Sequence, residues 1–189
     1  DVENAPVKDI SGNGNDGTAN SVSAVSSGKI AGAADFADTG WIGLDNFPDF
    51  NSSFTISAWI QTRDKTKQGQ RIFADDENNT GGYGFSLGDP GAGQLRFYSR
   101  NLGTISLDTG DIINNNTWYH TVAVADLDSG ERKIYVDGTL ESNDSFSNTW
   151  GTDSGTASIG GETDSGETGN RFDGFLDDVR IYDRALSGT

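Results

Sequence analysis

The sequence predicts an all-β fold, an antiparallel two-sheet sandwich of the jelly-roll type. In residues 54–60 the even-numbered positions are apolar, which is typical of a half-buried strand. About a dozen short segments of this kind are separated by turn clusters of Gly, Asn, Asp, Ser and Thr. No segment repeats its apolar residues with the period of a helix. Short alternating segments between turns favour a sandwich or jelly roll over any helical fold.

The alternation justifies each expected strand in turn. Trp118, His120 and Val122 share one parity, so they lie on one strand face. Leu95 and Phe97 face one way, while the arginines and the tyrosine between and after them give the other face a polar character. The expected strands are 41–44, 54–60, 71–74, 83–87, 94–100, 104–107, 118–124, 132–136, 156–159 and 172–182.

Residues 126–131 join two of these strands. The sequence Asp-Leu-Asp-Ser-Gly-Glu is that of a hairpin turn, with Gly130 supplying a positive φ angle. A chain of 189 residues suits one domain, and we expect the domain to span 1–189.

Composition excludes several functions. The net charge of −16 and the pI near 4.1 repel phosphate backbones and anionic bilayers, so we expect no nucleic-acid partner and no membrane insertion. The absence of cysteine and the single histidine exclude disulfides, thiolate zinc sites and multi-histidine metal clusters. Oxygen-liganded cations such as calcium stay possible. Because the chain begins at Asp1 without a signal peptide, we expect a monomeric module of something longer.

Two patterns resemble catalytic motifs. Residues 84–88 match the G-x-S-x-G of a nucleophile elbow, but no helix follows, and we expect the one available base, His120, to be a hydrogen-bonded core histidine. Residues 162–167 match the E-x-D-x-x-E of retaining glucanases, whose carboxylates need a rigid strand. Thr163, Ser165 and Gly166 describe a loop instead. A solvated acidic loop, a cation or ligand loop and a catalytic pair stay open.

Two acidic segments are candidate calcium sites. Residues 9–17 begin like a calcium loop, although an ordinary Asx/Gly turn has the same composition. Asp177 shares parity with apolar neighbours, so its carboxylate should point inward, where it needs a metal, an arginine or backbone donors. Asp75 and Asp76 follow the strand ending at Ala74 and read as a loop tip, either solvated or holding calcium with Asn78. Trp41, Trp150 and Tyr98 are candidates for stacking on a sugar ring, with plain packing as the alternative.

Several strings resemble a known family. Residues 11–17 (SGNGNDG), 54–60 (FTISAWI), 118–123 (WYHTVA), 133–138 (KIYVDG) and 172–187 (FDGFLDDVRIYDRALS) occur in this order. Together they resemble the laminin-G-like, concanavalin A-like jelly-roll modules of bacterial surface and secreted proteins, including ligand-binding domains of large calcium-dependent adhesins. The resemblance covers essentially the whole chain.

The resemblance implies a structural calcium near the paired termini and, in many members, a carbohydrate site at the sheet edge or the concave face. On this chain the implied calcium ligands are Asp177 with Asp9, Asn13, Asn15 or the Gly17 carbonyl. The glucanase acids are not reproduced in strand context, so the resemblance argues against an enzyme.

We therefore expect a calcium-dependent lectin module of an extracellular or cell-surface bacterial protein, with glycans as partners. Asp75, Asp76 and Asn78 would hold the calcium together with Glu162 and Asp164 on another loop. Flanking sugar contacts would come from Tyr98, Arg100 and Trp150. A structural or protein-binding spacer with only the terminal calcium is the main alternative, and a β-glucan hydrolase is the second.

Overall fold

The computed structural model describes residues 5–44, 46–48, 50–77, 81–100, 104–146, 157–163 and 170–187. Its strands, in chain order, are β1 (Ala5–Val7), β2 (Gly17–Asn20), β3 (Ser23–Val25), β4 (Ala33–Asp35), β5 (Trp41–Leu44), β6 (Phe54–Thr62), β7 (Gln70–Glu77), β8 (Gly81–Leu87), β9 (Leu95–Ser99), β10 (Ser106–Asp108), β11 (Tyr119–Asp126), β12 (Glu131–Val136), β13 (Thr139–Ser145), β14 (Ala157–Ile159) and β15 (Gly174–Tyr182). The described residues contain no helix that is long and apolar enough to cross a membrane.

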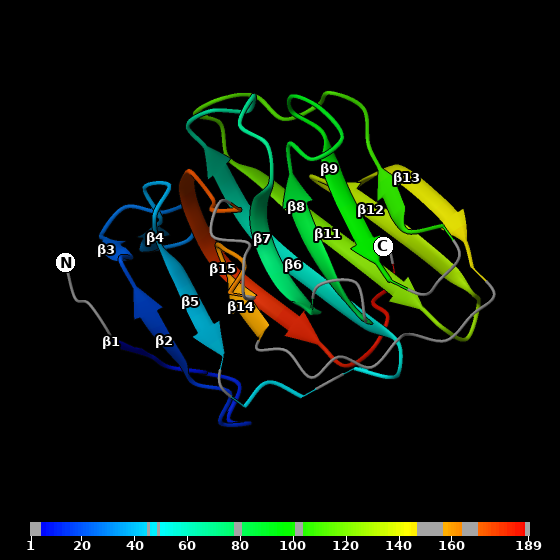
Figure 1. Ribbon diagram of the computed structural model, residues 1–189, viewed down its shortest axis with the longest axis horizontal. Coiled ribbons are helices and arrows are strands. Elements are labelled where there is room, and N and C mark those ends of the chain that lie inside the picture. Colours follow the sequence, from blue (N-terminus) through cyan, green and yellow to red (C-terminus); the bar gives the residue numbers. More distant parts are fainter. Residues whose placement is uncertain are drawn as a thin grey trace.

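The strands form two antiparallel sheets that pack face to face (Figure 1). The eight-stranded sheet has the order β1-β2-β5-β14-β7-β8-β9-β10, and the seven-stranded sheet has the order β13-β12-β11-β6-β15-β4-β3. Strands β1 to β5 lie at one end of the sandwich, and β12 and β13 lie at the other (Figure 1). The predicted all-β, two-sheet sandwich is confirmed.

The core lies between the sheets and follows the alternation of the sequence. On β6 the even-numbered side chains are fully buried, whereas Trp59 and Gln61 on the other face are half-buried. Leu95 and Phe97 of β9 also point into the core, as predicted, and leave Arg96 on the outer face. The 126–131 hairpin is confirmed too, because β12 follows β11 through this turn and Gly130 has a φ of 67°.

His120 lies on the outer face of the seven-stranded sheet, so the prediction of a core histidine is wrong. On β11 the core-facing side chains are Thr121, Ala123 and Ala125. Both faces of this strand carry apolar residues, and the face with the smaller side chains, the alanines, is the one that packs into the core. The predicted hydrogen bond is present, since the His120 imidazole Nε2 lies 2.9 Å from Ser57 Oγ. The imidazole also contacts the Trp59 indole, with ring centroids 5.2 Å apart.

The position of His120 predicts a pH dependence. Burial lowers the pKa of His120, and Arg180 acts in the same direction against the opposing charges of Asp137 and Asp178. The unfolded chain therefore binds this proton more readily than the folded chain. The stability contributed by His120 is complete above the unfolded pKa of about 6.5 and is lost as pH falls toward the lower folded pKa.

We expect an NMR titration of the single histidine to give a pKa below that of the urea-unfolded chain. In Arg180→Gln the pKa should rise, because a cation is removed and the Asp178 carboxylate, which it pairs with, is released. A folded-state pKa equal to or above the unfolded value would contradict this assignment.

Candidate binding site

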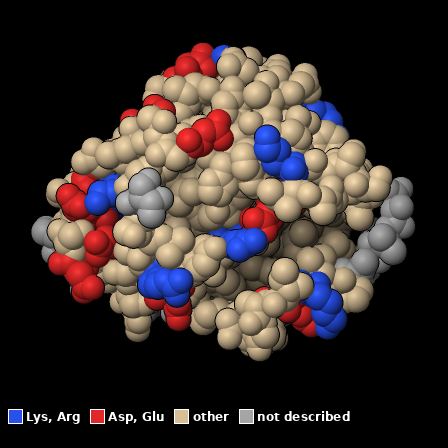
Figure 2. Space-filling view, turned by 180° about the vertical axis from the view of Figure 1, so that it is seen from behind, with Lys and Arg blue, Asp and Glu red and all other residues tan. Residues whose placement is uncertain are grey.

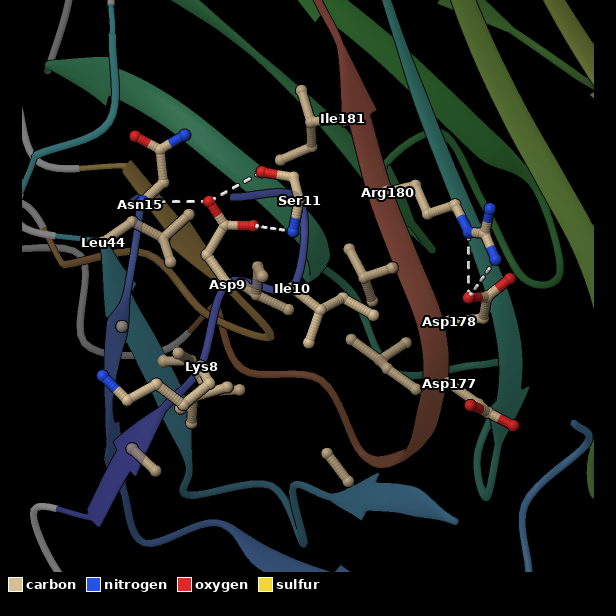
Figure 3. Close-up of a pocket in the computed structure, with 18 of the residues that line it drawn as sticks. Lys8, Asp9, Ile10, Ser11, Asn15, Leu44, Asp177, Asp178, Arg180 and Ile181 are labelled. Carbon is tan, nitrogen blue, oxygen red and sulfur yellow. Dashed lines mark hydrogen bonds and ion pairs between the residues drawn. The ribbon is translucent and has the colours of Figure 1, made fainter. Parts of the chain in front are cut away.

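A cavity of about 1000 Å³ opens between the two sheets at the end formed by β1 to β5 and β15. Its floor is apolar and includes buried core residues of both sheets: Ala19, Val22, Ile42, Leu44 and Leu176. Its rim is polar and includes Asp9, Ser11, Asn13 and Asn15. The paired side chains of Asp178 and Arg180 lie on the other side of β15 from Asp9 (Figure 3). An apolar floor with a few polar groups at the rim is the usual form of a small-ligand site.

The 9–16 loop on the rim is ordered by its own carboxylates. Asp9 accepts hydrogen bonds from the Ser11 amide at 2.8 Å, the Ser11 hydroxyl at 2.8 Å and the Asn15 amide at 3.0 Å (Figure 3). Asp16 accepts a bond from the Asp9 amide at 2.9 Å and pairs with the ammonium group of Lys8. The bonds from Ser11 lower the pKa of Asp9. The Asp9 carboxylate therefore stabilises an Asx turn through the hydrogen bonds that it accepts from Ser11 and Asn15.

The amide side chains of Asn13 and Asn15 in this loop have no hydrogen-bond partner among the described residues. Both asparagines are among the residues that line the cavity. Gly17, at the start of β2, is buried, and a Cβ atom there would lie 2.7 Å from Ile42 and 2.9 Å from the Gly43 carbonyl oxygen. Only glycine allows β2 to approach β5 this closely.

Asp177 is buried, but its face differs from the predicted one. The core-facing residue is its neighbour Leu176, and a register shift between Asp177 and Arg180, with Asp178 at a φ of 48°, changes the parity of β15. The Asp177 carboxylate accepts hydrogen bonds from the backbone amides of Lys29 and Ile30, both at 2.8 Å. Backbone donors, one of the alternatives to a metal, therefore satisfy this carboxylate.

The predicted terminal calcium ligands line one cavity but do not converge. Asp9, Asn13, Asn15, Gly17 and Asp177 all contribute to the lining. In Figure 3, however, the Asp177 carboxylate lies across β15 from Asp9 and points away from it. In the part of the chain that the structure describes, no three acidic or imidazole side chains are grouped as metal ligands. These residues do not fit a shared calcium ion in the arrangement described, and calcium stays a prediction.

The second predicted calcium site is part of a strand, and the prediction of a loop tip is wrong. Strand β7 continues past Ala74 to Glu77, so Asp75 and Asp76 project to opposite faces. Asp75 lies opposite the core residue Tyr83. Asp76 is paired with Arg100, whose Nη2 lies 2.7 Å from its carboxylate. The Arg100 guanidinium therefore neutralises the Asp76 carboxylate, the role predicted for a calcium ion. Asn78 lies outside the described residues.

The described members of the predicted sugar-binding set, Glu162, Tyr98 and Arg100, lie on the outer face of the eight-stranded sheet, away from the cavity. Glu162 is only 3% exposed and accepts hydrogen bonds from Arg71 Nε at 2.9 Å and Asn170 Nδ2 at 3.0 Å, so it is not a solvated loop residue. Tyr98 lies over Gly84, where an added Cβ would meet the phenol ring at 2.3 Å. Asp164 and Trp150 lie outside the described residues.

Arg71 and Arg171 are the residues of this face that the sequence did not reveal. Burial disfavours the charged form of Arg71, but Tyr98, Asp89 and Glu162 raise its pKa above the usual value. Burial also raises the pKa of the Tyr98 hydroxyl. Arg171 stacks on the Trp41 indole, with its guanidinium carbon 4.3 Å from the ring centroid.

The G-x-S-x-G pattern has no catalytic geometry. Ser86 is a buried residue in the middle of β8, and its hydroxyl donates to Asp89. His120 belongs to the other sheet and pairs with Ser57. The serine and the histidine therefore cannot act together.

Comparisons with known proteins agree with this architecture. The family model of the concanavalin A-like lectin/glucanases superfamily matches residues 36–189. Domain 4 of AbnA, a GH43 extracellular arabinanase from Geobacillus stearothermophilus solved with arabinotriose, has a TM-score of 0.71 at 21% identity and covers 96% of this chain and 89% of its own. The Ruminococcus gnavus IT-sialidase CBM40 bound to α2,3 sialyllactose has a TM-score of 0.62 at 16% identity and covers 78% and 92%.

Domains LG4-5 of the mouse laminin α1 chain are also similar, with a TM-score of 0.63 at 16% identity over 82% of this chain and 44% of that one. At these identities the structural likeness shows the fold alone. The comparison with curated protein sequences gave no match.

Proposed function

The chain belongs to the concanavalin A-like lectin/glucanase superfamily, and from this premise we propose that it is a carbohydrate-binding module without catalytic activity. The observation that carries the proposal is the cavity between β1 to β5 and β15, with its apolar floor and polar rim. We place the module in a larger exported bacterial protein, for which an adhesin is one setting. The domain of an extracellular arabinanase and the sialidase CBM40 that share its fold support this proposal, because both were solved with oligosaccharides.

The chemistry of the cavity suits a saccharide. A sugar ring has apolar C–H faces that can pack on apolar side chains of the cavity lining, while its hydroxyls need donors and acceptors at the edge. The side chains of Asn13 and Asn15 each supply both types of group and have no competing partner in the described part of the loop. Recognition therefore needs little rearrangement.

We expect Asn13→Ala/Asn15→Ala to weaken the binding of a neutral oligosaccharide about tenfold or more, the loss of one or two good hydrogen bonds. Isothermal titration with a panel that includes arabinotriose tests this. Neither amide supports the fold, so the melting temperature should stay unchanged. The matched control is Asn143→Ala, an exposed asparagine on β13 at the far edge of the seven-stranded sheet. Absence of binding across a broad glycan array would leave only the spacer alternative.

Calcium dependence is tested in the same titration. Among the predicted calcium ligands, the carboxylates of Asp9 and Asp177 accept hydrogen bonds from backbone amides and that of Asp76 pairs with Arg100. We expect binding and the melting temperature to be the same with calcium and with a chelator. An ion that binds only the folded chain would instead raise its stability by about 4 kcal/mol at a thousandfold excess over Kd. Such a shift would restore the calcium-dependent lectin expected from the sequence.

A further inference from the structure

The ion pairs among the described residues leave one buried arginine without an acidic partner. Six of the eight arginines pair with carboxylates in the described ranges: Arg63, Arg71, Arg96, Arg100, Arg132 and Arg180. On the back of the molecule several Lys or Arg side chains lie beside acidic ones (Figure 2). Arg171 and Arg184 form no ion pair with the residues described, and of these two Arg184 is exposed. A buried cation without a counter-ion in a chain of net charge −16 requires an explanation.

Arg171 is held rigidly. It is 8% exposed, its guanidinium stacks 4.3 Å above the Trp41 ring, and its Nη1 donates a 2.5 Å hydrogen bond to the Glu162 carbonyl oxygen. Neither Nε nor Nη2 has a hydrogen-bond partner among the described residues, and neither is fully enclosed. The Nε and Nη2 donors of Arg171 therefore lie in one plane that packs against Trp41, and their outer edge is not fully enclosed.

Among the described residues, the neighbouring acid Glu162 does not neutralise Arg171. The Glu162 carboxylate is taken by Arg71 and Asn170, and it is the Glu162 backbone that contacts Arg171. Burial lowers the pKa of Arg171, and Glu162 opposes this only in part. The desolvation free energy of the Arg171 guanidinium is therefore not offset by a carboxylate among the described residues.

A second polar group on the same outer face lacks a partner. The Tyr98 hydroxyl is buried and forms no hydrogen bond within the described part of the structure. The Arg71 guanidinium lies over the Tyr98 ring, with its Cζ 5.1 Å from the ring centroid, and pairs with Glu162, whose backbone carbonyl contacts Arg171. Unpaired donors from one strand, β9, and from the loop before β15 thus lie near the Arg71–Glu162 pair.

We propose that Arg171 binds the carboxylate of an acidic sugar, such as a uronic or sialic acid, at a second site on the outer face of the eight-stranded sheet. The inference rests on the proposed carbohydrate-binding function but uses a different surface from the cavity. Nε and Nη2 present the forked edge that matches a carboxylate with two parallel hydrogen bonds. Trp41 holds the guanidinium plane in place from behind.

The test compares acidic oligosaccharides with their methyl esters, which differ in charge and little else. We expect oligogalacturonate, hyaluronan oligosaccharides or 3′-sialyllactose to bind the wild type about tenfold or more tightly than the corresponding ester, as measured by isothermal titration at low salt. Arg171→Gln should bind acid and ester equally. Arg184→Gln removes the same charge from an exposed arginine and should keep the full preference.

Folding of the variants is checked by circular dichroism, because Arg171 is buried. Two readouts are independent of the glutamine variant. Arg171→Lys keeps the charge but loses the fork, so most of the preference should disappear. In the wild type the NMR signal of the Arg171 Nε–H group should shift with the acid and not with the ester.

The two proposals fail separately. If no acidic saccharide binds better than its ester, or if Arg184→Gln loses the preference as fully as Arg171→Gln, the Arg171 site is excluded. Neutral oligosaccharides that still depend on Asn13 and Asn15 would then leave the proposed function intact. Acid-selective binding that Asn13→Ala/Asn15→Ala does not affect would support the Arg171 site. The cavity site would be excluded if, in addition, no neutral oligosaccharide bound in a way that depends on Asn13 and Asn15.

Discussion

Phe54→Ala is expected to lower the melting temperature by about 10 °C. Truncating a fully buried phenylalanine to alanine lowers the free energy of unfolding by about 3–5 kcal/mol. In a chain of this size the melting temperature falls by about 2–4 °C for each kcal/mol. Phe54 is fully buried at the centre of the aromatic core. Its ring centroid lies 4.3 Å from that of Tyr83, 5.6 Å from that of Phe50 and 5.9 Å from that of Phe97.

Thermal and urea unfolding measure the effect. Phe54→Leu keeps most of the volume and should lose less than half as much stability, while Ile105→Ala removes an apolar side chain that is 59% exposed and should change little. If Phe54→Ala were no more destabilising than Ile105→Ala, the aromatic cluster would not be the main core of the sandwich.

The same core explains why the fold can be predicted from the sequence. On β6, β8 and β9 large apolar residues alternate with polar or small ones, so parity alone identifies the buried face. The segments predicted between 41 and 182 correspond to β5–β12, β14 and β15, with ends that differ by a few residues. Strands β1 to β4 are short and rich in alanine, and β13 (TLESNDS) is almost wholly polar, so their pairing depends on neighbours that local pattern does not reveal.

Parity was misleading where both faces of a strand are apolar or where the ladder is irregular. On β11 valines lie outside and alanines inside, which reversed the expected side for His120. On β15 the register shift at Asp178 placed Leu176 in the core and left Asp177 against the 29–30 backbone. An aspartate tolerates the positive φ of such a bulge, but it does so in many turns and gives no specific signal.

The candidate sites show a second limit. Acidic residues are visible in the sequence, but their partners are not: Glu162 pairs with Arg71 across 91 positions, and Asp76 pairs with Arg100 across 24. Of the acids predicted to bind calcium, Asp76 pairs with Arg100, and Asp177 accepts hydrogen bonds from the backbone amides of Lys29 and Ile30. The lack of an acidic partner for Arg171 among the described residues likewise cannot be seen in the sequence, because it becomes apparent only after the other arginines are paired.

Arg132→Met is expected to destabilise the fold about as much as Phe54→Ala, by about 3–5 kcal/mol, because it removes one member of a buried ion pair. Arg132 of β12 is fully buried and points between the sheets. Its Nε donates to Asp144 of β13 at 3.0 Å, and Nη1 donates to the Ser99 hydroxyl of β9 at 2.6 Å. Nη2 donates to the Thr104 carbonyl oxygen at 3.0 Å. One guanidinium thus joins the far edge of one sheet to the other sheet.

A double-mutant cycle separates the loss of these bonds from the exposure of an unpaired charge. Arg132→Met leaves the Asp144 carboxylate, 23% exposed, without its cation, whereas Arg132→Met/Asp144→Leu removes both charges. The double variant should therefore be more stable than Arg132→Met alone, as measured by urea unfolding. Arg180→Met, which breaks an exposed pair with Asp178, should cost less than about 1 kcal/mol. Additive effects in the cycle would mean that Arg132 stabilises the sandwich through Ser99 and the 104–105 carbonyls, with no net contribution from its ion pair.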